Sequence, residues 1–361
     1  MPRATLAPLA DDQGRPWVLA AGGAGFIGSH VCAELMSAGY GVVILDSFVN
    51  SDPGVVERIN SLGHGRVEVV QGDLRDVRRL DHVFRAYEIA AVVHLAGLKA
   101  VGESVAAPLR YYDANVSGAV ALFDAMRRHG VRRLVFSSSA TVYAEPGANI
   151  DEAAPLGALN PYGRTKLFIE RIIDDMAAAD SRFAAISLRY FNPVGAHASG
   201  ALGEEPRGAP TNLFPWIAQV AAGRRPSLRV FGDDYETPDG SGVRDFIHVV
   251  DLAAGHRAAI DLLTHDRSMD GENTPINLGT GRGYSVFEAA RAFSAAAGVD
   301  IPVEVAPRRP GDAAECTADP SKAARLLGWR AQHGLERMCA DHWRFEMSRA
   351  RRSADEALEV A

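Results

Sequence analysis

The sequence has little cysteine, no long apolar run and no basic tract, and each absence excludes a class of protein. Its three cysteines, Cys32, Cys316 and Cys339, are widely spaced, which fits neither a disulfide framework nor a metal motif and indicates a reducing compartment, the cytoplasm. No stretch reaches the roughly 18 apolar residues of a membrane span. A net charge of −7, without a basic block interleaved with aromatics, argues against nucleic acid as a partner.

Short apolar runs alternate with helical patterns through the first half of the 361 residues. Continuous β-branched runs between such patterns are typical of a parallel sheet covered on both faces. We therefore predict an α/β fold, a Rossmann-type doubly wound parallel sheet, with a smaller α/β substrate lobe towards the C-terminus. The predicted strands are WVLAAG from Trp17, GVVILD to Asp46, RVEVVQGD to Asp73, AAVVHLAG to Gly97, RRLVFSSS to Ser139 and FAAISLRYF to Phe191.

This alternation stops after Phe191. Residues 192–245 are rich in glycine, proline, asparagine and aspartate and contain one clear helical pattern, at 214–222. Such composition usually carries binding loops. We predict a dinucleotide-binding domain at 17–192 with 242–262 returning to it, a second lobe from 193–241 and 263–345, and loose termini at 1–16 and 346–361.

Gly22, Gly25 and Gly28 follow at a spacing of three between a predicted strand and a predicted helix. In such a turn the first glycine allows the bend, the second lets backbone approach a pyrophosphate, and the third lets the helix pack on the strand. Asp46 ends the next strand, where a carboxylate binds a ribose and repels a 2′-phosphate. The turn predicts NAD rather than NADP; the alternative for Asp46 is a helix N-cap. Asp73 either accepts a hydrogen bond from the adenine amino group or caps a helix.

Tyr162 and Lys166 lie four residues apart in NPYGRTKLFIE, on one face of a predicted helix. A free tyrosine has a pKa of about 10 and is therefore a poor base at neutral pH. An ammonium one turn away and a nicotinamide cation favour the phenolate. Ser139 ends the fifth strand, where open α/β sheets bind ligands. We predict these three as the catalytic group for hydride chemistry, with a surface pair as the alternative for Tyr162 and Lys166. Ser137 and Ser138 are expected to satisfy backbone groups.

These features together resemble the extended short-chain dehydrogenase/reductase family and, within it, the UDP-glucose 4-epimerases. The similar segments extend from Val18 to about Trp343. They are GGAGFIGSH at Gly22, AGLKAVGESV at Ala96, YYDANV at Tyr111, SSSATVY at Ser137, LRYFNPVGAH at Leu188, GVRDFIHVVDLA at Gly242, NLGTG at Asn277 and RRPGD at Arg308.

The resemblance implies an isomerase that interconverts UDP-glucose and UDP-galactose for galactose metabolism and nucleotide-sugar supply. Tyr162 would remove the proton from the sugar O4 while the C4 hydride passes to a permanently bound NAD. The 4-keto sugar, held by its UDP, would turn over and take the hydride back on its other face. A homodimer is also implied, with the helices at 105–126 and 162–176 as candidates for its interface.

The same resemblance implies the contact residues. Arg244 and Arg309 are fixed cations suited to a diphosphate, and Phe231 is suited to stacking on uracil. The cofactor-binding residues would be Gly22, Gly25, Phe26, Ile27, Gly28, Asp46, Ser47, Phe48, Val49, Asn50, Ser51, Asp73, Leu74, Leu95, Ala96, Gly97, Lys99, Asn115, Ser139, Tyr162, Lys166 and Phe191. The substrate-binding residues would be Lys99, Ser139, Tyr162, Asn192, Asn212, Leu213, Arg229, Val230, Phe231, Arg244, Arg309, Asp312 and Cys316. No metal is expected.

The identities of several residues bear on specificity. Cys316 is small where some family members have a bulky tyrosine beside the sugar 2-position, which implies that UDP-GlcNAc and UDP-GalNAc are also accepted; the alternative is a plain apolar wall residue. A 4,6-dehydratase would need an acidic pair after Ser139, where Ala140 and Thr141 stand. A non-enzymatic NAD-binding protein is disfavoured because Tyr162 and Lys166 are both present. A UDP-pentose or UDP-uronate 4-epimerase is the alternative that the sequence excludes poorly.

Overall fold

The computed structural model describes residues 17–359 except 64, 207, 209 and 310, so the predicted loose terminus at 1–16 lies outside the described residues. The chain forms two compact units. Unit 1 comprises the chain up to Val142, Leu156–Arg189 and His256–Ile276, and unit 2 comprises Tyr143–Pro155, Tyr190–Gly255 and the chain from Asn277. The predicted return of 242–262 to the first domain is corrected, because the boundary falls after Gly255. It lies inside one continuous helix, so no change of composition marks it.

A seven-stranded sheet forms the centre of unit 1, in the order β11-β6-β5-β4-β1-β2-β3. The pairs β1–β2, β1–β4, β2–β3 and β4–β5 are parallel. The order reverses between β1 and β4, which is the point where open α/β sheets bind their ligands. The strands are β1 (Trp17–Ala21), β2 (Gly41–Asp46), β3 (Glu68–Gln71), β4 (Ile89–His94), β5 (Arg133–Ser139), β6 (Ala184–Tyr190) and β11 (Glu272–Leu278).

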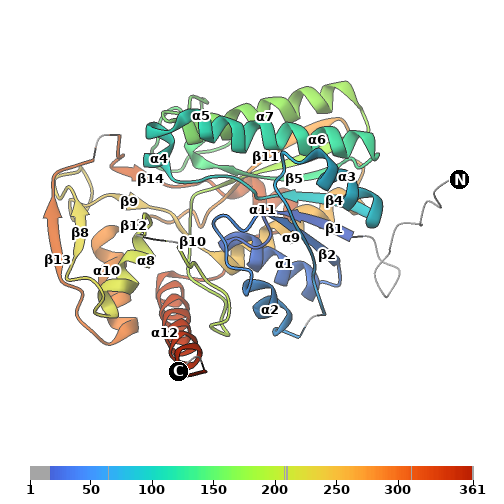
Figure 1. The fold of residues 1–361 in the computed structure, drawn as a ribbon. Coiled ribbons are helices and arrows are strands. Elements are labelled where there is room, and N and C mark those ends of the chain that lie inside the picture. Colours follow the sequence, from blue (N-terminus) through green and yellow to red (C-terminus); the bar gives the residue numbers. More distant parts are fainter. Residues whose placement is uncertain (1–16, 64, 207, 209, 310, 360–361) are drawn as a thin grey trace, which may run out of the picture. The chain divides into compact units, whose positions relative to one another are not determined.

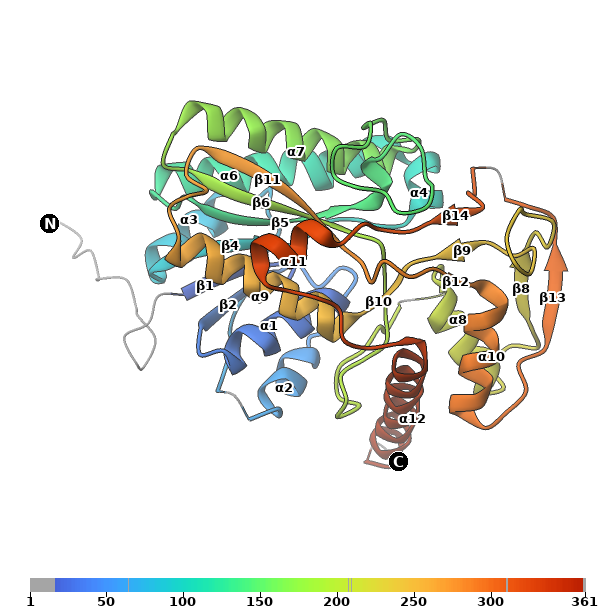
Figure 2. The same ribbon diagram turned by 180° about the vertical axis from the view of Figure 1, so that it is seen from behind.

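Helices cover both faces of this sheet. Figures 1 and 2 show α3, α6 and α7 along one face and α1 and α9 along the other. This doubly wound arrangement confirms the predicted fold class. The helices of this part of the chain are α1 (Phe26–Ser37), α2 (Val55–Asn60), α3 (Val77–Ala86), α4 (Val101–Ala106), α5 (Pro108–Tyr111), the π-helix η1 (Tyr112–Ser117), α6 (Gly118–Arg128), the 3₁₀-helix η2 (Ala140–Val142), α7 (Pro161–Ala179) and α9 (Val249–His265).

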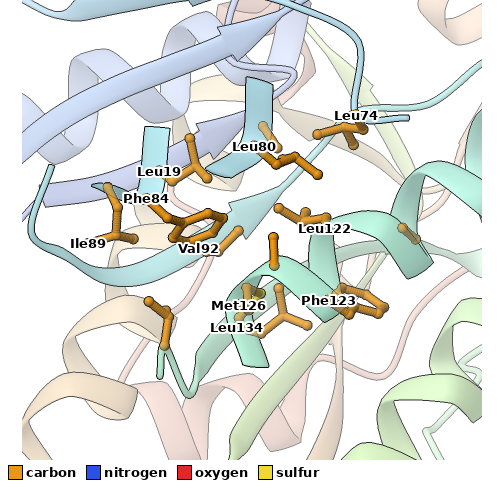
Figure 3. Packing of buried hydrophobic residues seen from close by; sticks show 14 of the residues in the cluster. Leu19, Leu74, Leu80, Phe84, Ile89, Val92, Leu122, Phe123, Met126 and Leu134 are labelled. Atoms are coloured by element: carbon orange, nitrogen blue, oxygen red, sulfur yellow. The ribbon is translucent and has the colours of Figure 1, made fainter. Parts of the chain in front are cut away.

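The core of unit 1 follows from helical and strand periodicity. In α3, Leu80, Val83 and Phe84 recur at spacings of three and one and are buried, while Asp76 caps the helix N-terminus. Figure 3 shows Leu80 and Phe84 meeting Leu19 and neighbouring strand and helix residues in one apolar layer. This layer fixes the strands whose carboxyl ends carry the predicted site.

Unit 2 contains short strands and helices around a separate core. Its apolar cluster includes Phe214 on α8, Phe246 on β10 and Phe293 on α10. Parallel pairs join β10 to β7, β13 to β8 and β14 to β9, and an antiparallel pair joins β12 to β9. Its elements are β7 (Asn192–Val194), α8 (Leu213–Ala221), β8 (Leu228–Phe231), β9 (Val243–Arg244), β10 (Phe246–His248), β12 (Tyr284–Ser285), α10 (Val286–Ala297), β13 (Val303–Ala306), β14 (Glu315–Cys316), α11 (Ser321–Leu327) and α12 (Leu335–Glu359).

The prediction of a loose C-terminus at 346–361 was wrong over most of that range, because α12 continues to Glu359. The segment FEMSRARRSADEALE contains alanine, arginine, glutamate and methionine without glycine or proline. These residues have high helix propensity, so a charged tail of this composition extends the helix. No helix in the described ranges combines the length and apolarity that crossing a membrane requires.

Candidate active site

The glycine turn between β1 and α1 has the geometry that the spacing predicts. Gly22 has φ +82°, and a Cβ there would lie 2.5 Å from the backbone N of Ala96. A Cβ on Gly28 would lie 2.3 Å from the carbonyl O of Gly22. Gly25 differs, since its nearest neighbour would be Gly22 O at 3.5 Å. Two glycines therefore serve close packing within the protein, and Gly25 leaves open space at the helix start.

The N-terminus of α1 is suited to an anion. Gly25 is its N-cap, without a side-chain hydrogen bond to the first turn, and no acidic residue occupies that turn. Uncapped N–H groups and the helix dipole together favour a phosphate. The turn can thus hold the pyrophosphate of a dinucleotide.

A cleft of about 310 Å³ opens beside this turn, entirely within unit 1. It brings together twelve of the residues predicted to bind the cofactor, and adds residues that the sequence did not indicate. The predicted lining residues are Gly22, Gly25, Asp46, Ser47, Val49, Asn50, Ser51, Asp73, Leu74, Leu95, Ala96 and Gly97. The additional ones are Leu45, Gly72, Arg75, Leu98, Arg110 and Ala114.

Asp46 organises the mouth of this cleft. One carboxylate oxygen accepts the backbone N–H of Ala24 at 3.0 Å. The other accepts the N–H of Phe48 at 2.9 Å and the hydroxyl of Ser51 at 3.1 Å. The carboxylate thus links the glycine turn to the loop after β2. Its remaining lone pairs can accept ribose hydroxyls, and its charge opposes a 2′-phosphate.

Asp73 forms a charged network. Arg75 donates from Nε to Oδ1 at 2.9 Å and from Nη2 to Oδ2 at 2.6 Å, and also contacts Asp113. These hydrogen bonds lower the pKa of Asp73. The neighbouring helix α3 is capped by Asp76 instead, so helix capping does not account for Asp73. Arg75 is the residue that sequence reasoning missed here, although it stands two positions later.

Asn115 is buried in the π-helix η1, and all of its polar groups bind protein. Its Nδ2 donates to Leu98 O and to Thr165 Oγ1, both at 3.0 Å, and its Oδ1 accepts from Leu98 N at 2.8 Å. A π-helical turn of this kind often occurs at functional sites. Asn115 therefore ties the loop after β4 to α7, the helix that carries the predicted tyrosine and lysine.

Tyr162, Lys166 and Ser139 come together in unit 1. The ammonium of Lys166 donates to the carbonyl O of Ser137 at 2.7 Å. The Oγ of Ser139 accepts the N–H and the hydroxyl of Thr141, at 3.2 and 3.0 Å, which leaves its own O–H to donate towards Tyr162. The three predicted catalytic side chains thus converge at the end of β5.

Opposing effects set the charges in this group. Burial raises the pKa of Tyr162, and the hydrogen bond with Ser139 lowers it. Burial lowers the pKa of Lys166 to about 8, and the negative charge of Glu170 opposes that fall. The Nζ of Lys166 lies 5.0 Å from the ring centre of Phe136 and 5.9 Å from that of Tyr162. A lysine that changes charge near neutral pH can control the acidity of a neighbouring phenol.

Sequence reasoning missed one residue of this group, Gly163, and misassigned another, Ser138. A Cβ on Gly163 would lie 2.6 Å from Thr141 O, so this glycine lets the first turn of α7 approach the end of β5. The sequence offered one signal for this role, since Gly163 directly follows Tyr162. The expectation that Ser138 satisfies backbone was wrong, because its hydroxyl donates to Glu170.

In unit 2, cations flank Phe231. The guanidinium carbons of Arg309 and Arg229 lie 4.6 and 5.6 Å from its ring centre. Arg309 also donates to Asp312 at 2.7 Å. Four predicted substrate contacts therefore form one cluster around an aromatic ring, namely Arg229, Phe231, Arg309 and Asp312.

Arg244 and Cys316 are neighbours in unit 2. They are Cα partners in the parallel pair of β9 and β14. Arg244 donates from Nη1 to the carbonyl O of Val243 at 2.8 Å. Burial raises the pKa of Cys316 to about 11. Its thiol therefore stays protonated and uncharged at neutral pH.

The remaining predicted residues occupy varied positions. Asn212 stands at the N-cap position of α8 without a side-chain capping hydrogen bond, and its Nδ2 donates to Glu204 at 2.6 Å. Leu213 begins α8, and Asn192 begins β7. Val230 is buried. Phe26 and Ile27 open α1, Lys99 follows β4, and Phe191 alone of the predicted cofactor contacts belongs to unit 2. Among the described residues, no group of histidine, cysteine and carboxylate side chains could hold a metal.

Comparisons with known proteins identify the family of this chain. The family model of GDP-mannose 4,6 dehydratase matches residues 19–342. UDP-glucose 4-epimerase of Bacillus subtilis is 52% identical over 332 residues, covering 92% of this chain and 97% of that protein. The human UDP-glucose 4-epimerase is 51% identical over 337 residues, covering 91% and 96%.

Solved structures give the same result. The UDP-glucose 4-epimerase of Stenotrophomonas maltophila, with bound NAD and formylated UDP-arabinopyranose, has a TM-score of 0.90 and 49% identity, covering 93% of this chain and 99% of that chain. The enzyme of Bifidobacterium longum in complex with NAD+ and UDP has a TM-score of 0.88 and 48% identity, covering 92% and 99%. Fold, site and similarity agree, and the chain therefore belongs to the UDP-glucose 4-epimerase family, within the extended short-chain dehydrogenase/reductases.

Proposed function

We propose that this chain is an NAD-dependent isomerase that interconverts UDP-glucose and UDP-galactose. The observation that carries the proposal is the convergence of Tyr162, Lys166 and Ser139 at the end of β5. Ala140 and Thr141 follow in η2, so the acidic pair that a dehydratase would use is absent at these positions. The matched dehydratase family model thus describes the fold, and the epimerase relatives describe the chemistry.

Residues of unit 1 fit NAD. The uncapped start of α1 would hold the pyrophosphate beside Gly25, and Asp46 would accept the ribose hydroxyls. Bound NAD supplies a hydride acceptor and donor for C4 of the sugar. The open space at Gly25 and the fixed orientation of Asp46 support this assignment.

Tyr162 moves the proton. Its phenolate would take the proton of the sugar O4 and later return it, while the O–H of Ser139 stabilises the oxygen that carries the charge. Lys166 favours the phenolate as a neighbouring cation. In unit 2, Arg244 and Arg309 would bind the diphosphate and Phe231 the uracil, so that the sugar remains tethered while it turns.

Conversion of UDP-galactose without added NAD tests the proposal. The purified enzyme should form UDP-glucose, detected by anion-exchange chromatography, because NAD is regenerated in each cycle. UDP-arabinose offered in parallel tests the alternative of a pentose epimerase. Enzyme that contains NAD but leaves UDP-galactose unchanged would overturn the assignment.

Lys166 should give the reaction an alkaline limit. Its lowered pKa of about 8 means that the activating ammonium is present below pH 8 and lost as the pH rises through that value. We expect kcat to fall across this window. Lys166→Arg keeps a cation far above pH 8, so its kcat is lower but its alkaline decline moves to higher pH. An unmoved decline would show that another group sets it.

We also propose that Cys316 admits N-acetylated sugars. Its side chain is small and neutral beside the predicted diphosphate ligand Arg244. We expect wild type to convert UDP-GlcNAc, and Cys316→Tyr to lose that conversion at least about tenfold while keeping UDP-galactose turnover, because a filled pocket rejects extra bulk. Equal, negligible UDP-GlcNAc turnover in both would refute this.

A cytoplasmic homodimer completes the proposal. The helices at 105–126 and 162–176 expose large apolar side chains, with Leu109 at 81% and Val105 at 63% exposure and Val120 and Phe168 about half exposed. Exposed apolar side chains that gather on one surface mark protein interfaces, and these four come from the helices of the proposed interface. Light scattering should therefore give the mass of two chains.

A further inference from the structure

A buried carboxylate behind the catalytic group has no role in the steps described so far. Glu170 lies four residues after Lys166 and eight after Tyr162, so all three share one face of α7. Its side chain is only 4% exposed. A carboxylate at that depth needs strong partners, because burial of an uncompensated charge is costly.

Glu170 joins three elements of unit 1. Arg189 on β6 donates from Nε to Oε1 at 3.0 Å and from Nη2 to Oε2 at 2.7 Å. Ser138 on β5 donates its hydroxyl to Oε1 at 2.5 Å. The carboxylate therefore fixes the side chain of Ser138. This residue lies between Ser137, whose carbonyl O binds Lys166, and Ser139, which faces Tyr162.

Stability alone is a weak reason for such a pair. Desolvation of two buried charges offsets most of their attraction, and apolar replacements of buried ion pairs are often neutral or stabilising. The position of this pair, one helical turn from Lys166 and bonded to the strand end, is better explained by the reaction.

We propose that Glu170 is a positioning residue for the epimerase: through Ser138 it fixes the end of β5, and through its negative charge it keeps Lys166 an ammonium. This inference rests on the proposed function. Arg189 orients the carboxylate through its two hydrogen bonds. The hydrogen bond to Ser138 and the charge on Lys166 are separate effects of one side chain, so substitutions can separate them.

Charged and titratable groups of three elements lie around Lys166. Tyr162 and Glu170 face it from α7, His94 from the end of β4, and Arg189 lies behind Glu170 on β6. Burial lowers the pKa of His94 to about 3, so the imidazole is neutral. Glu170 is the charge that counters the lowered pKa of Lys166.

The scarcity of lysine permits a direct measurement. The chain contains three lysines, at 99, 166 and 322, so a protein labelled with [ε-¹³C]lysine gives three resolved titrations. In Glu170→Gln we expect Lys166 to titrate about one pH unit lower than in wild type, as for loss of an opposite charge nearby. The alkaline decline of kcat should move by the same amount, with KM for UDP-galactose unchanged.

Three further variants separate the effects. Ser138→Ala should lower kcat about threefold or more without moving the Lys166 titration, because one neutral hydrogen bond is lost and the charge stays. Asp270→Asn breaks a matched ion pair with Arg133 at the other end of β5 and should lower stability only. If Glu170→Gln does not fold, Glu170→Gln/Arg189→Gln leaves no unpaired charge and should give the same downward shift, because Glu170 rather than Arg189 acts on Lys166.

An unshifted Lys166 titration in the folded Glu170 variants would overturn the charge effect, and wild-type kcat in Ser138→Ala would overturn the positioning effect. Both results presuppose wild-type enzyme that converts UDP-galactose. Failure of wild type itself would instead overturn the proposed function.

Discussion

Tyr162→Phe is expected to lose kcat by about 10²–10⁴-fold, the range that a positioned acid/base contributes. The substitution keeps the ring 5.9 Å from the Lys166 ammonium and removes the oxygen that faces Ser139. The proton of the sugar O4 then has no acceptor among the three converging side chains. The substitution changes neither the glycine turn nor the arginines around Phe231. The NAD content and the KM for UDP-galactose should therefore stay close to those of wild type.

The control for this loss is Tyr40→Phe. Tyr40 also has a raised pKa, about 12, and its hydroxyl donates to Asp261 at 2.6 Å. Losing this bond should cost about 1 kcal/mol of stability and leave kcat unchanged, since Tyr40 precedes the amino end of β2, whereas the site lies at the carboxyl ends of the strands. Steady-state kinetics and thermal unfolding of both variants provide the comparison. If Tyr162→Phe kept more than a tenth of the wild-type kcat, Tyr162 would not be the acid/base of the reaction.

The sheet and the catalytic group were predictable because each depends on local pattern. Buried strands such as GVVILD are continuous apolar runs, and β2 follows that run from Gly41 to Asp46. A spacing of four on α7 places Tyr162 and Lys166 on one face whatever the rest of the chain does. The strand end at Ser139 adds a third group through the general topology of open sheets.

Features that depend on contacts distant in sequence were not predictable. Ser138 reaches Glu170 32 residues away, and nothing in SSSATVY distinguishes it from its neighbours. The unit boundary after Gly255 falls within α9, where helical periodicity continues unbroken. The extension of α12 was missed for a different reason, since charge density suggested a loose tail while helix propensity decided the outcome.

Gly25→Ala should fold normally and lose its NAD. A Cβ at this position meets only Gly22 O, at 3.5 Å, and the backbone angles, φ −73° and ψ 176°, suit alanine. The free energy of unfolding of the NAD-free protein should therefore change by less than about 0.5 kcal/mol, as at an unstrained, partly exposed site where the added methyl meets only ordinary contacts. The methyl group instead occupies the space where the pyrophosphate would approach the helix N-terminus. We expect NAD released on acid denaturation to fall at least about tenfold per chain, a loss of at least about 1.4 kcal/mol in binding.

Gly28→Ala should have the opposite effect, because it should lower the stability of the protein even when no NAD is bound. Its Cβ would lie 2.3 Å from Gly22 O and 2.8 Å from the Cα of Gly23, both backbone atoms that cannot rotate away. Forcing helix α1 from β1 should cost about 1–3 kcal/mol or more of stability even without NAD. Unfolding must be compared in NAD-free protein, because bound cofactor stabilises the folded state by mass action and would mix the two effects. If Gly25→Ala retained wild-type NAD, the pyrophosphate would not pass over this glycine; if both variants unfolded alike, close packing at Gly28 would not be what the third glycine provides.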